Sequence, residues 1–325
     1  MLQIDSLCIE FRQERARVAA VRDVSLALAP GECVGVVGES GSGKTQTFLA
    51  AMGLLGRNAL VSGSIRFEGR ELLAAATSEL NRVRGARLAM IFQDPMTSLT
   101  PHLTVGVQMA EVLVCHAGLS WTAAKRKALD MLQTVRIADA ARRMRQYPHE
   151  LSGGMRQRVM IGMSLLCEPA LVIADEPTSA LDATIHVQVI ELLAAMRREF
   201  RMAIALISHD LCAVHALADR VVVMYAGRVV EQGLVGEVFG QPGHPYTRGL
   251  LRARPQVGRR QARLYSIPGQ VPSLVNPGAG CLFADRCPAV LPVCRLIDPF
   301  LASVGAGHRV ACHRTETPSP EGTHG

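Results

Sequence analysis

Long apolar runs are missing from this chain of 325 residues. A membrane-spanning helix needs about 18 to 20 consecutive apolar residues, and no stretch of the sequence approaches that length. Residues 1–17 carry charged side chains where a secretory signal peptide would have its apolar segment. The sequence therefore predicts a soluble protein without a membrane span or an export signal, on the cytoplasmic side of the membrane.

Aromatic residues are also scarce, at 4% of the chain, and no helix-turn-helix or zinc-finger spacing occurs. Both facts argue against nucleic-acid binding, although the formal net charge is +7. Part of that charge lies in a stretch of arginines without an acidic residue, which we interpret as a solvated linker or as a contact for anionic headgroups or a membrane partner. Its members are Arg252, Arg254, Arg259, Arg260 and Arg263.

The chain does contain alternating strand-like and helix-like segments, and 49% of its residues are hydrophobic, which is enough for a buried core. Residues 171–175 and 203–208 are almost entirely apolar, as in parallel strands covered on both faces, and residues 185–200 between them have helical periodicity. Apolar and polar residues alternate, as in antiparallel strands, over residues 2–11, 18–28 and 64–68. These patterns predict an α/β fold.

A phosphate-binding loop lies between a strand-like segment and a helix-like segment that runs through Leu55. Its sequence GESGSGKT matches the pattern G-x-x-x-x-G-K-[ST]. The glycines allow backbone N–H groups to point at phosphate oxygens, and the helix directs the positive end of its dipole at the same anion. Lys44 should reach the β- and γ-phosphates, and Thr45 should coordinate Mg²⁺. We expect the nucleotide to contact Gly38, Glu39, Ser40, Gly41, Ser42, Gly43, Lys44 and Thr45.

Two adjacent acids end the apolar run at residues 171–175. Asp175 is the last residue of the expected strand, where it can hold Mg²⁺ through the water shell of the ion. Glu176 follows directly and should leave the strand in a different direction, toward the attacking water. We therefore predict that Glu176 is the catalytic base.

A second glycine motif, LSGGMRQ at residues 151–157, precedes another expected helix. Ser152, Gly153 and Gly154 offer a hydroxyl, bare backbone and a helix dipole to a phosphate. Because the chain already has one phosphate loop, this second anion site must serve another nucleotide.

Taken in their order along the chain, the motifs resemble those of the ATPase subunits of ATP-binding cassette (ABC) transporters, over roughly residues 1–240. The resemblance implies a P-loop NTPase with a parallel core sheet, an antiparallel β subdomain and a helical subdomain at about residues 101–163. It also implies roles for Glu176 as the base, for Gln93 in a loop that senses Mg²⁺ and the γ-phosphate, and for His209 as the switch histidine. Gln93 lies in IFQDPMTSL and His209 in LISHD.

The same resemblance implies a dimer of cassettes. In the family, the glycine motif at Ser152 closes over ATP held by the partner subunit, and the sequence SALD at residues 179–182 matches the loop that crosses the interface. The chain departs from the family pattern at the adenine, where many members place an aromatic residue. Arg15 stands at that position here, and Phe11 is the nearest aromatic candidate.

Residues 241–325 form a tail rich in proline, glycine and arginine. Its segments GHPYTRGLL and IPGQVP resemble the C-terminal extension of oligopeptide, dipeptide and nickel importer ATPases. The resemblance implies the ATPase subunit of a bacterial peptide-type importer, peripheral on the cytoplasmic face of the inner membrane. Its partners would be a second, paralogous ATPase subunit, two membrane permease subunits and, indirectly, an extracytoplasmic solute-binding protein. A soluble accessory ATPase of the phosphonate-breakdown type and a metal- or redox-responsive module stay open as alternatives.

The tail holds four of the nine cysteines, at the spacing C-x5-C-x6-C-x17-C. A reducing cytoplasm disfavours disulfides, and zinc sites usually have tighter C-x2-4-C pairs. Four cysteines can hold a [4Fe-4S] cluster, and similar tails in peptide importer ATPases are consistent with one. An iron–sulfur cluster, zinc and metal-free thiols stay open for Cys281, Cys287, Cys294 and Cys312. The other five cysteines are expected to be small core residues.

Overall fold

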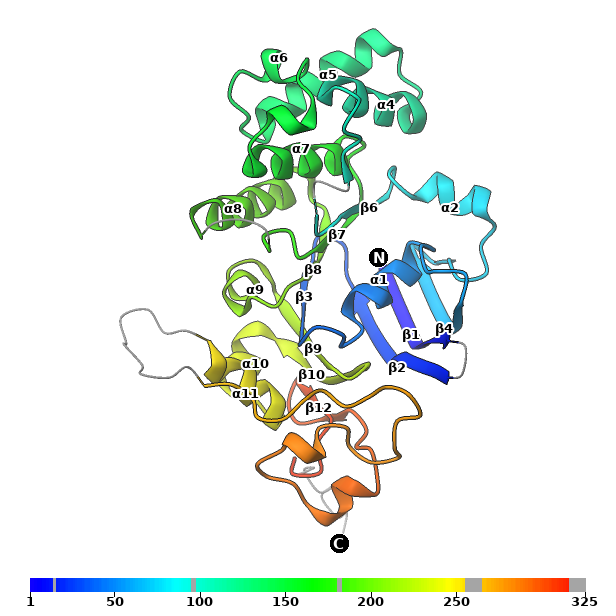
Figure 1. Ribbon diagram of the computed structural model, residues 1–325, viewed down its shortest axis with the longest axis vertical. Coiled ribbons are helices and arrows are strands. Elements are labelled where there is room, and N and C mark those ends of the chain that lie inside the picture. Colours follow the sequence, from blue (N-terminus) through cyan, green and yellow to red (C-terminus); the bar gives the residue numbers. More distant parts are fainter. Residues whose placement is uncertain (14–15, 95–97, 180–182, 255–264, 316–325) are drawn as a thin grey trace, which may run out of the picture. The chain divides into compact units, whose positions relative to one another are not determined.

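The computed structural model describes residues 1–13, 16–94, 98–179, 183–254 and 265–315 (Figure 1). The chain divides into two compact units, and each is described by itself. The first consists of residue 1 and residues 28–33 and 68–208, and the second of residues 2–27, 34–67 and 209–325.

Three buried strands form the parallel sheet of the first unit, in the order β6 (Leu88–Ile91), β7 (Leu171–Asp175) and β8 (Ala203–Ile207). Every residue of these strands is buried, which explains why their sequences are apolar throughout rather than alternating. Helix α8 (Ala183–Phe200) connects β7 to β8 as predicted. The strand β5 (Arg70–Glu71) and the helix α2 (Thr77–Val83) precede this sheet in the chain.

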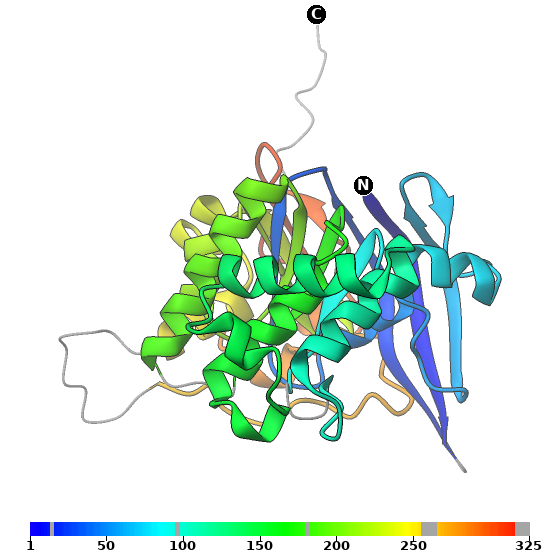
Figure 2. The same cartoon turned by 90° about the horizontal axis from the view of Figure 1, so that it is seen from above.

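The remaining helices of the first unit pack on one another, as Figures 1 and 2 show for the cyan-green segments. They are α4 (Val105–Ala117), α5 (Trp121–Thr134), α6 (Ala140–Arg143), the short η1 (Pro148–Glu150) and α7 (Gly153–Leu165). Ser120 and Ser152 begin α5 and α7 by accepting an N–H from the first turn, which is why each helix starts at that serine. These helices occupy the region for which the sequence predicts a helical subdomain.

An antiparallel sheet opens the second unit, with the strand order β2 (Ala16–Leu28), β1 (Leu2–Gln13) and β4 (Ala59–Phe67). Leu2 pairs with Phe67 at one end of β1, and Phe11 pairs with Ala59 near the other. The alternation of apolar and polar residues predicted these strands, although β4 begins five residues before the expected Ser64.

The second unit also contains a mixed sheet. Strand β3 (Cys33–Val37) runs parallel to β9 (Arg220–Tyr225), and β9 forms an antiparallel hairpin with β10 (Arg228–Leu234). The two turn residues, Ala226 and Gly227, both have positive φ (48° and 82°), which is the backbone of the commonest tight hairpins.

The tail adds strands to this mixed sheet. β10 pairs with β12 (Arg309–Val310), and β12 pairs with β11 (Ala302–Ser303). Residues 265–315 therefore belong to the same unit as the phosphate loop. The helices of this unit are α1 (Lys44–Ala51), α9 (Leu211–Leu217), α10 (Val235–Gly240), α11 (Pro245–Ala253) and the short η2 (Ala284–Arg286) and η3 (Pro292–Arg295).

Two sequence expectations need correction. Helix α1 ends at Ala51 rather than Leu55, because Gly53 has a φ of 59° that a continuing helix does not allow. Cys115 and Cys212 are exposed, not core residues, since they lie on the outer sides of α4 and α9; Cys33 is buried, and Cys8 and Cys167 are half-buried.

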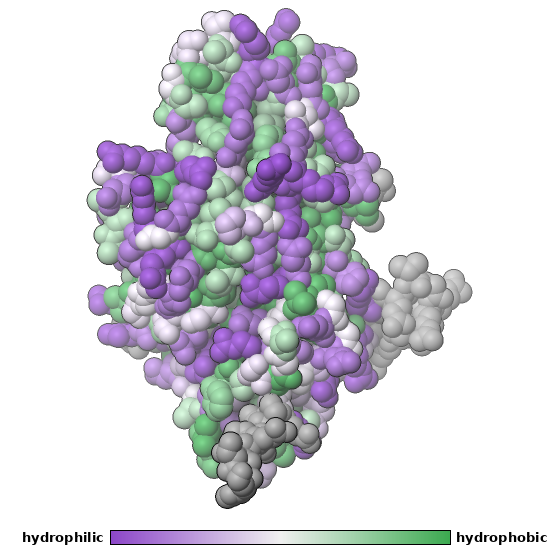
Figure 3. All heavy atoms as spheres, turned by 180° about the vertical axis from the view of Figure 1, so that it is seen from behind, coloured by the Kyte–Doolittle hydropathy of each residue, from purple (hydrophilic) through white to green (hydrophobic). Residues whose placement is uncertain are grey.

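Hydrophilic residues are spread among smaller hydrophobic patches on the face drawn in Figure 3. Over the part of the chain that the structure describes, no helix is both long and apolar enough to cross a membrane.

Candidate active site

The phosphate loop joins β3 to α1 and owes its shape to glycine. Gly38, Gly41 and Gly43 have φ values of 151°, 78° and 95°, which other residues rarely adopt. A Cβ at Gly38 would lie 2.1 Å from the carbonyl oxygen of Met224, and one at Gly43 would lie 2.5 Å from that of Ala20. The loop is thus pressed against β2 and β9, and its backbone has the concave form that binds anions.

Lys44 is buried at the first position of α1, with 6% of its surface exposed. Its Nζ donates to the carbonyl oxygens of Gly38 (2.8 Å) and Glu39 (3.0 Å) and to Oγ of Ser42 (3.4 Å). These bonds hold the ammonium group over the loop, where a polyphosphate can accept from it. Thr45 follows on the first turn of the helix and is half-buried.

The acid pair sits at the end of β7 in the first unit. Asp175 is buried within the strand, whereas Glu176 adopts a φ of 46° and turns out of it. The Nε2 of Gln93 donates to Oε2 of Glu176 over 3.2 Å. The structure therefore brings together Gln93 and Glu176, two of the predicted catalytic residues, and the backbone turns out of the strand at Glu176.

Ser152 and Gly153 are exposed at the start of α7 in the same unit. The Oγ of Ser152 accepts the N–H of Met155 over 3.4 Å. A Cβ at Gly153 would meet no described atom within 4 Å, while one at Gly154 would crowd Ile185 at 3.0 Å. Within the described part of the first unit, the first residue of this helix is therefore accessible.

His209 is exposed between β8 and α9, and Asp210 beside it caps α9 by accepting the N–H of Cys212 over 2.7 Å. The phosphate loop and His209 belong to the second unit, and Gln93, Ser152, Asp175 and Glu176 to the first. Several predicted features lie outside the described residues, namely Arg15, residues 95–97 of the Gln93 loop, residues 180–182 of the interface loop, and Arg259, Arg260 and Arg263.

The four cysteines of the tail line one cavity. Burial is the main factor that raises the pKa of the Cys281 thiol to about 11, and charges at Asp298, Cys294 and Cys287 act in the same direction. Burial likewise raises the pKa of Cys312. Among the described residues, however, no three histidine, cysteine or acidic side chains are arranged to hold a metal ion.

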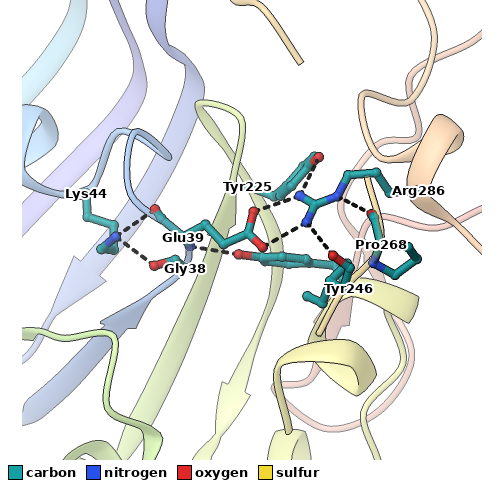
Figure 4. Close-up of polar contacts among 8 residues, drawn as sticks. Gly38, Glu39, Lys44, Tyr225, Tyr246, Pro268 and Arg286 are labelled. Atoms are coloured by element: carbon teal, nitrogen blue, oxygen red, sulfur yellow. Dashed lines mark hydrogen bonds and ion pairs between the residues drawn. The ribbon is translucent and has the colours of Figure 1, made fainter. Parts of the chain in front are cut away.

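Sequence reasoning missed how the tail is fixed to the phosphate loop. Arg286, in η2, forms an ion pair with Glu39, the second residue of the loop, and the hydroxyl of Tyr246 accepts the backbone N–H of Glu39 (Figure 4). The motif pattern leaves the position of Glu39 unspecified, so only the three-dimensional contact reveals its partners.

A buried carboxylate and a buried histidine anchor the start of the tail. Glu231, fully buried on β10, accepts from the backbone N–H groups of Gly243 (2.7 Å) and His244 (2.9 Å) and contacts Nε2 of His308 (2.8 Å). Burial lowers the pKa of His244 to about 3, with the charge of Arg248 as a second cause. The neutral ring accepts the N–H of Tyr246 at Nδ1, which starts α11.

Comparison with known proteins places these features in a family context. A family described as ABC transporter matches residues 21–179, and one described as the oligopeptide/dipeptide transporter C-terminal region matches residues 230–294. The oligopeptide transport ATP-binding protein OppD of Salmonella typhimurium is 47% identical, over 97% of this chain and 93% of its own length. That of Haemophilus influenzae is 46% identical, over 96% of each.

Solved structures agree on the fold. A dimeric bacterial ABC transporter cassette matches 72% of this chain and 99% of its own with a TM-score of 0.65 at 24% identity. The Clostridium perfringens protein cbiO1, part of an ABC transporter complex, matches 74% of this chain and 90% of its own with a TM-score of 0.62 at 26% identity.

Proposed function

Because this chain belongs to the ABC transporter family and carries the C-terminal region of its oligopeptide/dipeptide branch, we propose that it is the ATP-hydrolysing subunit of a bacterial importer for peptides or a related solute. The observation that carries the proposal is the likeness to oligopeptide transport ATP-binding proteins along nearly the whole chain, tail included. A soluble accessory ATPase would share the cassette but would not need this tail. A regulatory module would not need a complete set of nucleotide motifs.

ATP binds at the phosphate loop in this proposal. The backbone N–H groups of residues 38–45 donate to the phosphate oxygens, and Lys44 turns from the loop carbonyls to the β- and γ-phosphates. Thr45, Gln93 and Asp175 would be the residues that hold Mg²⁺, as the family resemblance implies. The bound ion would neutralise charge on the transferring phosphoryl group.

Hydrolysis depends on Glu176, whose Oε2 already contacts Gln93. Glu176 accepts a proton from the attacking water as the water oxygen bonds to the γ-phosphorus and the bond to ADP breaks. In this proposal Asp175 serves the metal and Glu176 serves the water, and the backbone turn at Glu176, with its φ of 46°, supports this division of roles. His209 acts beside the γ-phosphate.

A second cassette completes the site. Ser152, Gly153 and Gly154 bind the γ-phosphate of ATP held by a partner ATPase subunit, a role that the exposure of the α7 start supports. The complex would also contain two membrane permease subunits and receive solute from a binding protein. In it this chain lies peripherally on the cytoplasmic face of the inner membrane.

A charge at the α7 start tests the dimer. Ser152→Arg should spare ATP binding but abolish ATP-dependent dimerisation, because the cation fills the space of the partner's γ-phosphate. Ser120→Arg is the matched control, since Ser120 caps α5 in the same way. Light scattering with ATP and the partner ATPase subunit should detect dimers with the control alone, and dimers that contain the Ser152 variant would contradict the proposed closure.

We also propose that the four tail cysteines hold a [4Fe-4S] cluster with a structural role. Four thiols around one cavity are the donor set of such a cluster, although the thiols must turn toward a common centre to bind it. Protein purified without oxygen should be brown, with about four irons per chain, and Cys294→Ser should lose them while Cys115→Ser keeps them. Colourless, iron-free protein would contradict the cluster. If that protein contained one equivalent of zinc, the site would be a zinc site instead.

The function itself is tested in the assembled complex. The chain should co-purify with polytopic membrane subunits. Vesicles in which this subunit faces the lumen should take up peptide only when the lumen contains ATP. An active ATPase that never associates with membrane subunits would favour the accessory class instead.

A further inference from the structure

Glu39 is held by an arginine of the tail. The Nη1 of Arg286 donates to Oε2 of Glu39 over 2.7 Å, and Nη2 donates to Oε1 over 3.0 Å (Figure 4). The side chain of Arg286 is 5% exposed and that of Glu39 is 26% exposed. A bidentate guanidinium–carboxylate pair of this kind fixes distance and orientation together.

Arg286 is in turn held by its own surroundings. Its Nε donates to the carbonyl oxygen of Pro268 (2.9 Å), Nη2 also reaches that of Ile267 (3.4 Å), and Nη1 also reaches Oη of Tyr225 (3.2 Å). The pair with Glu39 is the largest factor that raises the pKa of Arg286. These bonds hold the guanidinium of Arg286 in place, and its ion pair in turn positions the side chain of Glu39.

Tyr246 makes a second attachment to the same residue of the loop. Its Oη accepts the backbone N–H of Glu39 over 2.8 Å. The ring is fully buried and packs against Tyr225 and Phe283, with centroids 4.6 and 5.5 Å away. Both the side chain and the backbone of Glu39 are thus bound to parts of the chain beyond the cassette motifs.

These attachments act on the atoms that orient Lys44. The two carbonyls that accept from its Nζ belong to Gly38 and Glu39. Glu39 also puts a negative charge beside a loop that must receive a polyphosphate, and Arg286 neutralises it. From this geometry we infer that Tyr246 and Arg286 are positioning residues of the phosphate loop, so that ATP affinity depends on the C-terminal extension.

The expected effect is on binding rather than on chemistry. If the held loop is the form that binds ATP, releasing it reduces the fraction of competent molecules and raises the apparent Kd by the same factor. Once ATP is bound, its own contacts order the loop, and turnover at saturation should change little. This inference rests on the proposed function.

Tyr246→Phe is the sharpest variant, because it removes one oxygen and leaves the buried ring in place. We expect its Kd for ATP to rise roughly five- to tenfold, the range for leaving a partly buried N–H without its acceptor. Its kcat at saturating ATP should stay within about twofold of the parent chain. Tyr265→Phe is the matched control, since Tyr265 lies in the same tail under Arg252, and it should bind ATP as the parent does.

A double-mutant cycle tests whether Arg286 acts through Glu39. Arg286→Met should raise the Kd at least as much as Tyr246→Phe, and adding Glu39→Gln should raise it no further. Arg295→Met is the control, because Arg295 forms an exposed pair with Asp285 in the same tail. If the effects of Arg286→Met and Glu39→Gln on the Kd were additive, the assignment of Arg286 would be overturned.

The outcomes separate this inference from the proposed function. A parent chain that binds ATP and a Tyr246→Phe chain that binds it equally well would overturn the positioning role alone. A parent chain with no affinity for ATP would overturn both. A fall in kcat with unchanged Kd would also contradict positioning of the loop.

Discussion

The phosphate loop and the C-terminal extension are fixed in opposite ways, although they belong to one compact unit. Local sequence shapes the loop, because its glycines adopt φ values closed to other residues and a helix follows at once. Between α11 and β11 the described residues of the extension, 265–301, form short helical turns and depend on distant partners instead. Asp298, for example, accepts from Arg22 over 3.3 Å and from Arg228 over 2.6 Å. The phosphate-loop motif thus specifies which groups bind the nucleotide, while contacts from distant parts of the chain hold that loop in place.

Substitutions at motif residues should give the largest effects, and Glu176→Gln the largest of all. The amide cannot accept a proton, so turnover should fall by about 10² to 10⁴ while ATP binding persists. ATPase assays with Glu168→Gln give the control, because Glu168 is another glutamate with positive φ, exposed on the same unit. Turnover within a few-fold of the parent would remove Glu176 from the role of base.

Lys44→Ala should act at the binding step. Losing the charged bonds to the β- and γ-phosphates should weaken ATP binding by about 10- to 100-fold. Isothermal titration would measure the loss, with Lys127→Ala as the control, since Lys127 is a lysine of α5 that forms an exposed pair with Glu168. An ATP affinity of Lys44→Ala equal to that of the parent would contradict the prediction, because the phosphate-loop motif would then contribute no more to ATP binding than the extension does.

The buried histidine of the extension should have a smaller effect, on the pH dependence of folding stability. Unfolded histidine titrates near pH 6.5, whereas burial lowers the pKa of His244 to about 3. The unfolded chain therefore takes up a proton that the folded chain excludes, and stability that is complete above pH 6.5 is lost as the pH falls toward 3.

Between pH 7 and pH 5 the parent chain should lose about 1 to 2 kcal/mol more stability than His244→Asn, which keeps an acceptor for the N–H of Tyr246 but does not titrate. Urea unfolding at the two pH values would measure the difference, with exposed His102→Asn as the control. Equal losses in the parent and in His244→Asn would mean that His244 is not a buried neutral anchor.

The sequence predicted the strands and the nucleotide motifs because their causes are local. Apolar runs gave β7 and β8, alternation gave β1 and β2, and the glycine pattern gave the phosphate loop. For Glu176 the sequence predicted only that the chain leaves the strand after Asp175; the positive φ at Glu176 was not predicted.

The attachments of the extension could not be predicted in this way. Nothing in the neighbourhood of Arg286 indicates a partner 247 positions earlier, and Glu39 occupies a position that the motif leaves open. The partners of buried Glu231 are equally invisible, because Gly243 and His244 lie 12 and 13 positions away and His308 lies 77 positions away. Such contacts depend on tertiary packing, which no local pattern encodes.

Hydrogen exchange of the amides in residues 38–45 tests most directly whether the extension holds the loop. In the nucleotide-free chain, Tyr246→Phe should speed exchange in this segment roughly five- to tenfold, while Tyr265→Phe leaves it unchanged. Exchange in the loop that is the same in Tyr246→Phe as in the parent would contradict the account.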